Sequence, residues 1–150
     1  SPGWEAIKAA ERSGRNPDAS ALAGVARALP ALKRAEKIQA RAARVGFDWP
    51  DASGPRAKIA EELAELDSAG DAAERAAELG DLLFAAVNLA RHLGIDPETA
   101  LRNATDRFEQ RFRVVEESAG KSLSELDIDQ LEALWQQAKR QLREEAPLHT

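Results

Sequence analysis

The stretch from Asp71 to Gly94 constrains the fold of this chain more than any other. Asp71 is a good helix N-cap and Gly94 a good helix stop, so the segment predicts one long helix. Apolar side chains cover most of its circumference: Leu79, Leu82, Leu83, Phe84, Val87, Leu89, Ala90 and Leu93. A helix that is apolar nearly all round is usually buried. A partner surface is therefore expected to cover it, and periodicity does not decide whether that surface lies within the chain or on a second chain.

The remaining segments also predict helices. The chain is rich in Ala, Leu, Glu, Arg and Lys, and we find no convincing strand periodicity, which indicates an all-α protein. Glycine, proline and helix-capping residues punctuate the sequence and predict further helices at residues 2–12, 30–45, 56–68, 96–120 and 128–144. The short connections between them favour a four-helix-bundle-like fold.

Composition narrows the classes of function. The net charge of -5 does not favour binding to a nucleic-acid polymer. The absence of cysteine excludes disulfides and thiol chemistry. No apolar stretch is long enough to span a membrane, and no signal-peptide pattern opens the chain, so a cytoplasmic protein without membrane association is expected. Because the chain begins with Ser1 and contains no methionine, we expect a fragment of a longer protein.

Acidic residues recur at helical spacing on two consecutive helices. On the helix at 56–68, Glu62 lies about 60° and Glu65 about 120° from the centre of the apolar stripe, whereas Glu61 lies nearly opposite it. On the long helix, Glu78 and Asp81 share one stripe with Asn88 and His92.

Buried carboxylates are costly unless they are paired or bound to a metal. One interpretation is a structural salt bridge to a basic side chain of a neighbouring helix. The other is a divalent cation held by Glu62, Glu65, Glu78 and Asp81, whose oxygen ligands suit Mg²⁺ or Mn²⁺. The spacing leaves both open. His92 stands at a helix end, where an imidazolium is favoured by the helix dipole, and we interpret it as structural.

The motif "EELAE", a spacer and then "ELGD" resembles the EExxE…ExxD signature of MazG-type nucleoside triphosphate pyrophosphohydrolases. The flanking blocks "RAEKIQARAARVGFDWP", "RFEQRFRVVE" and "LWQQAKRQ" are similar to the C-terminal catalytic half of full-length MazG. The resemblance implies a linker with a short helix at residues 1–28, a catalytic helical domain at 29–145 and a disordered tail at 146–150. It also implies a homodimer.

The resemblance implies an activity and a set of roles. The activity is Mg²⁺-dependent hydrolysis of nucleoside triphosphates to a monophosphate and pyrophosphate, with Mn²⁺ as a substitute, in housecleaning of the nucleotide pool. Water activated by the metal on Glu62, Glu65, Glu78 and Asp81 would attack the α-phosphorus, and Glu61 would orient or deprotonate that water. Residues that match nucleotide-contacting positions are Lys58, Asn88, Arg107, Arg111, Trp135 and Lys139. Arg107 stands where the family usually has lysine, so its contact geometry differs.

Two rival functions remain beside this one. A narrower relative would act on one deoxynucleotide, such as dUTP or dCTP. A non-catalytic helical module would serve dimerisation or nucleotide binding without hydrolysis. Without the resemblance, the basic residues would be interpreted as a solvated face and Trp135 as core. Trp49 could stack on a base or anchor its loop, and we favour the anchor.

Overall fold

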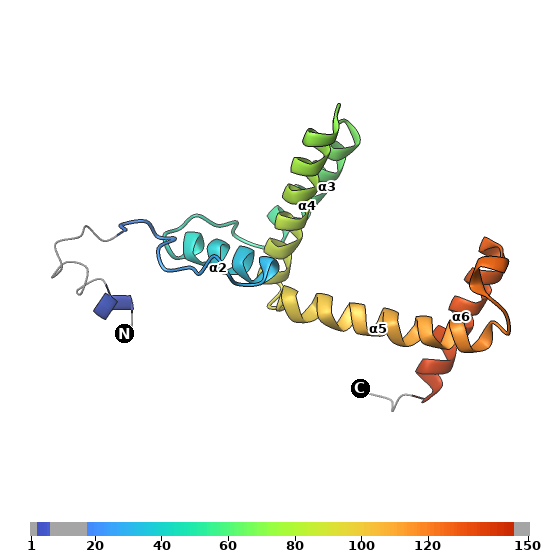
Figure 1. The fold of residues 1–150 in the computed structure, drawn as a ribbon. Helices are drawn as coiled ribbons and strands as arrows, with labels where there is room; N and C mark the ends of the chain where they lie inside the picture. The colour runs from blue at the N-terminus through green and yellow to red at the C-terminus, as the bar shows by residue number, and fades with distance from the viewer. Residues whose placement is uncertain (1–2, 7–17, 146–150) are drawn as a thin grey trace. The chain divides into compact units, whose positions relative to one another are not determined.

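The structure is a computed structural model that describes residues 3–6 and 18–145, and the regular elements among them are all helical (Figure 1). The elements are α2 (Ala31–Arg44), α3 (Ser53–Asp67), α4 (Ala72–His92), α5 (Pro97–Ser118), the 3₁₀-helix η1 (Leu123–Glu125) and α6 (Ile128–Glu145). The all-α prediction is confirmed. Residues 3–6 are helical, whereas the rest of the helix predicted at 2–12 and the tail predicted at 146–150 lie outside the described residues.

Local capping chemistry sets the ends of α4 as the sequence predicts. The Asp71 side chain accepts a hydrogen bond from the backbone N–H of Glu74 at 2.8 Å, and this satisfies one of the donors that a helix N-terminus leaves free. At the other end Gly94 has a φ of 70°, and the N–H of Ile95 returns to the carbonyl of Ala90 at 2.9 Å. A left-handed glycine with such a return bond is a common helix stop.

The helix α3 begins earlier than predicted, at Ser53 rather than Arg56. Pro55 lies in its first turn, where a missing backbone N–H costs nothing because that donor has no partner inside the helix. The carboxylate of Asp51 accepts the N–H of Ser53 at 2.8 Å and so fixes the turn that precedes the helix. The loop predicted from Phe47 to Pro55 is correspondingly shorter.

The chain divides into two compact units, residues 1–98 and 99–150. In the first unit, α3 and α4 lie side by side and are joined by the short connection at 68–71, so they run antiparallel (Figure 1). The helix α2 packs on α4, and Gln39 donates a hydrogen bond to the carbonyl of Phe84 at 2.9 Å. In the second unit, α5 and α6 meet where the rings of Phe108 and Trp135 lie 5.4 Å apart.

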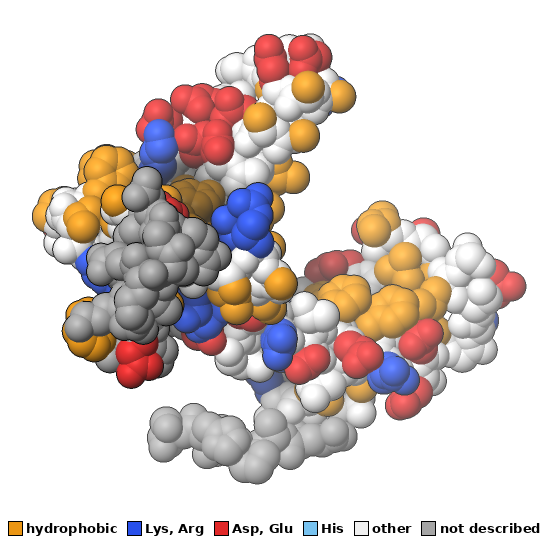
Figure 2. All heavy atoms as spheres, turned by 60° about the vertical axis from the view of Figure 1, so that its left-hand side comes forward, with side chains coloured by type: hydrophobic (Ala, Val, Ile, Leu, Met, Phe, Trp, Pro, Cys, Tyr) orange, Lys and Arg blue, Asp and Glu red, His pale blue; other side chains and the backbone are white. Residues whose placement is uncertain are grey.

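Much of the apolar surface of α4 is not covered within the first unit, so the partner surface expected for this helix is not found there. Leu79 is 47% exposed, Leu83 is 52% exposed and, on the neighbouring α3, Leu63 is 48% exposed. The buried side chains of α4 are Ala85 and Val87. Figure 2 shows apolar side chains at the surface of this unit. Within the first unit, the helices α2 and α3 cover part of α4 and leave an apolar face open. Among the described residues, none of the helices has the length and apolarity needed to cross a membrane.

Candidate functional site

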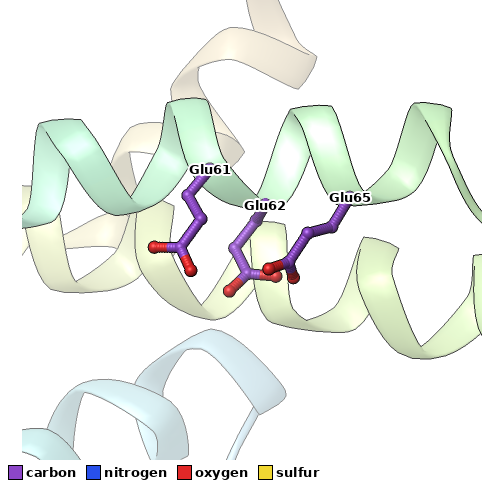
Figure 3. Close-up of side chains that lie close together, drawn as sticks. All are labelled: Glu61, Glu62 and Glu65. Carbon is purple, nitrogen blue, oxygen red and sulfur yellow. The ribbon is translucent and has the colours of Figure 1, made fainter.

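Three carboxylates project from α3 toward the neighbouring helix. Figure 3 shows Glu61, Glu62 and Glu65 close together along α3, and one oxygen of each lies within 4.8 Å of the others. Glu62 is 4% exposed, whereas Glu61 and Glu65 are exposed. Burial is therefore greatest for the residue that the helical angles place nearest the apolar stripe of α3.

The helix α4 brings a second acidic pair to the same place. Carboxylate oxygens of Glu62, Glu78 and Asp81 lie within 4.8 Å of one another, so Glu62 belongs to both groups. The antiparallel pairing of α3 and α4 produces this convergence, because an i, i+3 pair on each helix faces the other. Figure 2 shows acidic side chains gathered on this unit. The structure thus brings together the four carboxylates that the sequence proposes as metal ligands.

Lys58 supplies positive charge at one side of the acidic cluster. Its Nζ lies 3.2 Å from Glu62 Oε1 and 3.3 Å from Glu61 Oε2. Hydrogen bonding to Glu62, and then to Glu61, raises the pKa of Lys58. Burial alone would raise the pKa of Glu62, but hydrogen bonds from Lys58, Glu78 and Glu65 outweigh it and lower that pKa. Glu62 is therefore an ionised carboxylate in a buried position.

The pKa of Glu78 shifts in the opposite direction and is raised to about 7. The hydrogen bond to Glu62 is the largest cause of this shift, burial is the next, and Glu65 adds to both. The pKa of Glu65 is also raised, because Glu62 outweighs the lowering effect of the hydrogen bond to Glu78. Carboxylates this close cannot all ionise without opposing charge, so the metal-free cluster retains a proton.

A salt bridge to Lys58 accounts for Glu62 but not for the two carboxylates of α4. Glu62 Oε2 and Glu78 Oε2 are buried and meet no hydrogen-bond donor unless one carboxyl holds a proton. Within the described part of the chain, neither Glu78 nor Asp81 forms an ion pair with lysine or arginine. Oxygen-only ligands favour Mg²⁺ or Mn²⁺. Glu62, Glu65, Glu78 and Asp81 could hold such an ion, and an ion would satisfy both unpartnered oxygens.

A family model described as phosphoribosyl-ATP pyrophosphohydrolase matches residues 28–108, which include α2, α3, α4 and both acidic pairs. The chain belongs to this pyrophosphohydrolase family. The match covers the whole of the acidic cluster.

Individual relatives confirm the resemblance to MazG-type proteins. The chain is 46% identical over 146 residues to the nucleoside triphosphate pyrophosphohydrolase of Escherichia coli K12, covering 92% of this chain and 55% of that protein. It is 46% identical over 139 residues to the nucleoside triphosphate pyrophosphohydrolase/pyrophosphatase MazG of Thermotoga maritima, covering 91% and 54%. The protein YabN of Bacillus subtilis, described as uncharacterized, is 42% identical over 143 residues, covering 91% and 29%. The chain spans about half the length of the first two relatives.

Asp48 has a role that the sequence did not predict. It accepts hydrogen bonds from Arg91 Nη1 at 3.1 Å and Nη2 at 2.5 Å, and its Oδ1 lies 2.8 Å from His92 Nε2. The Arg91 hydrogen bond is the main cause that lowers the pKa of Asp48 to about 2. Arg91 in turn donates to Asn88 Oδ1 from Nε at 3.2 Å and from Nη2 at 2.9 Å. The structural interpretation of His92 fits this network, which ties the loop before α3 to the end of α4.

The remaining candidate residues lie in the second unit. Arg111 lies over the ring of Trp135 at 5.8 Å, so the structure brings these two together across α5 and α6. Arg107 is exposed one turn before Arg111 on α5, and Lys139 is half-buried one turn after Trp135 on α6. All four belong to the unit of residues 99–150.

Trp49 lies against the start of α3. A Cβ added to Gly54 would overlap the indole ring of Trp49, which shows that the ring packs directly on the glycine. This contact supports the interpretation of Trp49 as an anchor for its loop. The side chain is nevertheless 47% exposed and also lines a cavity beside α4.

Proposed function

We propose that the chain hydrolyses nucleoside triphosphates to a nucleoside monophosphate and pyrophosphate, with a divalent cation as cofactor. The observation that carries the proposal is the convergence of two acidic pairs on antiparallel helices, with buried oxygens that meet no donor. The names of two relatives support it, since both are called nucleoside triphosphate pyrophosphohydrolases. We further propose that the activity serves housecleaning of the nucleotide pool in the cytoplasm.

The cofactor in this proposal is Mg²⁺, for which Mn²⁺ should substitute. Glu62, Glu65, Glu78 and Asp81 would hold it, because they supply converging oxygen ligands and excess negative charge. When bound, the ion supplies charge neutralisation for the phosphates and lowers the pKa of a water molecule. Binding would also displace the proton that the hydrogen bond to Glu62 and burial favour on Glu78, whose pKa they raise.

The residues of α3 beside the ligands would position the attacking water. Glu61 is exposed at the edge of the cluster and shares Lys58 with Glu62. We assign Glu61 the role of orienting the water or accepting its proton, since its carboxylate reaches the cluster without being buried in it. Lys58 would turn toward substrate phosphate once a cation neutralises Glu62, because the two positive charges compete for one carboxylate.

We assign Arg107, Arg111 and Lys139 to contacts with the negatively charged phosphates, and Trp135 to a contact with the nucleotide. Such contacts catalyse mainly through positioning and electrostatic stabilisation. The guanidinium of Arg111 is already oriented by the ring of Trp135. Asn88 would also contact the nucleotide, from the end of α4.

We also propose a homodimer through the open face of α4. The residues of this face repeat at alternating steps of four and three along the helix, as in a coiled-coil seam: Ala72, Ala76, Leu79, Leu83, Ala86, Ala90 and Leu93. The three leucines are each about half exposed. An apolar seam of this length is a typical surface for helix–helix association.

Product analysis after incubation with a nucleoside triphosphate and Mg²⁺ tests the reaction. Monophosphate plus pyrophosphate, lost on addition of a chelator, is the expected result. Diphosphate plus orthophosphate would contradict cleavage between the α- and β-phosphates, and the absence of product would favour a non-catalytic module.

Asp81→Asn should lower turnover on the order of a hundredfold or more while the circular dichroism spectrum keeps its helical form. Asp67→Asn, on an exposed residue at the end of α3, is the matched control and should retain activity.

Two further measurements separate the rivals. Rates across the eight common ribo- and deoxyribonucleoside triphosphates distinguish a broad enzyme from one specific for dUTP or dCTP. Phosphoribosyl-ATP belongs on the same panel, because the matched family carries its name. Calorimetric titration with Mn²⁺ addresses the non-catalytic module, which should bind no stoichiometric metal.

A further inference from the structure

A stripe of basic side chains runs along α2 on the side that faces away from α4. At 100° per residue, the members of this basic stripe lie within about 80° of one another around the helix: Lys33, Lys37, Arg41 and Arg44. Gln39 donates a hydrogen bond to the carbonyl of Phe84 on α4, and it lies about 160° from the centre of the stripe. The basic stripe therefore does not share the face of α2 that packs on α4.

A cavity of about 440 Å³ lies along the basic stripe. Its other wall is formed by residues 24–29, which belong to the same compact unit as α2. The ionisable residues of the lining are the four members of the basic stripe and Glu36, so four positive charges face one negative charge. This excess stands out in a chain whose net charge is -5. The volume is that of a site for a small molecule, and the charge of the lining selects an anion.

Carboxylates of the chain offset only part of this charge. Lys33 has acidic partners, since its Nζ lies 3.4 Å from Glu36 and 4.0 Å from Asp96. The other three members of the basic stripe form no ion pair with any described residue. Lys37 stands four residues after Lys33 and four before Arg41, a spacing at which like charges destabilise a helix. The helix dipole favours basic residues in the last turn of α2 and gives no such support to Lys37.

Arg41 is held at the wall of the cavity by backbone groups. Its Nη1 donates to the carbonyl of Ala23 at 2.6 Å and to that of Ala21 at 3.4 Å. A Cβ added to Gly24 would lie 3.8 Å from Arg41 Nη2, which places this nitrogen beside the lining residue Gly24. Carbonyl groups orient the guanidinium without neutralising it, and a guanidinium has five N–H donors in a fixed geometry. The cavity therefore contains a preoriented positive charge with donors to spare.

We propose that this cavity binds a small anion with two or more linked phosphates, at a site separate from the acidic cluster. Arg41 would contact the phosphates together with Lys37 and Arg44, which are seven residues apart and so about 10 Å apart along the helix axis. A row of this length suits an extended chain of phosphates better than a single phosphate. Bound phosphate would also remove the repulsion between the like charges of α2, so binding should stabilise the first unit.

Isothermal titration calorimetry of the full chain with inorganic tripolyphosphate, in the presence of EDTA, tests the proposal. Without a metal the acidic cluster repels such an anion, so binding under these conditions does not depend on the proposed function. One tripolyphosphate per chain should bind, more tightly than orthophosphate or citrate. The double variant Lys37→Gln/Arg44→Gln, at two exposed positions, should weaken binding at least about tenfold. Arg75→Gln/Lys121→Gln removes the same two kinds of charge from exposed positions elsewhere and is the matched control.

Thermal melts give a second measurement of the same site. Tripolyphosphate with EDTA should raise the melting temperature of the wild-type chain and of the control, and should raise it much less in the α2 variant. Absence of metal-free binding to the wild-type chain would overturn the proposal, and so would equal weakening in both double variants. Binding that the α2 variant retains but Arg111→Gln loses would place the anion in the second unit instead. Citrate bound as tightly as tripolyphosphate, or a single-stranded oligonucleotide bound in its place, would refute the assignment to a small phosphate chain.

Discussion

Glu78 couples metal binding to proton release. Its pKa is raised to about 7, mainly by Glu62, so the metal-free cluster carries a proton at neutral pH that a cation must displace. The affinity for Mn²⁺ should therefore increase by up to about tenfold per pH unit below pH 7 and level off above it. Isothermal titration calorimetry from pH 6 to pH 8, in two buffers of different ionisation enthalpy, measures both the affinity and the released proton. Glu78→Gln should weaken binding and flatten its pH dependence; a wild-type affinity that is equally flat would contradict the coupling.

The same carboxyl makes the stability of the metal-free protein depend on pH. A carboxyl whose pKa rises on folding stays protonated in the folded chain while it ionises in the unfolded chain. The metal-free protein should therefore lose stability as the pH rises from about 4.5 to about 7, and this contribution should not change further above that range. Thermal melts with and without saturating Mn²⁺ check the sign, since the metal should remove the loss. The prediction would be refuted if the melting temperature of the metal-free protein rose from pH 4.5 to pH 7 and this rise were absent in Glu78→Gln.

At the scale of elements, the contact between Trp49 and Gly54 joins the loop to α3. Gly54→Ala would force the indole ring away, because the new Cβ would overlap it. A cost of about 1–3 kcal/mol in the free energy of unfolding is expected from this kind of overpacking. Urea unfolding measures it. Gly80→Ala on α4 is the control: nothing lies within 4 Å of the added Cβ, and alanine should stabilise the helix by about 0.5–1 kcal/mol. Equal effects of the two substitutions would argue against the Trp49 contact.

Local rules predict the elements well and their packing poorly. Asp71 and Gly94 mark the ends of α4 because caps depend on neighbouring residues alone. The acidic pairs converge as expected, because a short connection makes α3 and α4 antiparallel and helical spacing then determines which side chains meet. The exposure of Leu83 and the role of Asp48 could not be predicted in this way. Both depend on which helix or loop lies against α4, and residue periodicity carries no information about the partner.

At the scale of the whole molecule, the apolar face of α4 that the first unit leaves open needs a partner surface. Apolar residues that recur at alternating steps of four and three stabilise a protein when another helix packs on them. Half-exposed leucines without such a partner would contribute little. The acidic cluster uses a different stripe of α4, so association through the seam leaves the carboxylates accessible to substrate. We therefore expect the assembled protein to bury the face that the first unit leaves open.

Leu83→Glu tests this expectation at the centre of the seam. Burying a charge against an apolar surface should weaken dimerisation by at least about tenfold, measured as the dissociation constant in sedimentation-equilibrium experiments. Ile128→Glu is the matched control, because Ile128 is 77% exposed at the first residue of α6, where an acidic side chain is compatible with the helix dipole. Dimers that persist in Leu83→Glu but dissociate in Ile128→Glu would move the interface to α6. A wild-type chain that is monomeric at all concentrations, with an unchanged melting temperature in Leu83→Glu, would show that the seam does not mediate association between copies.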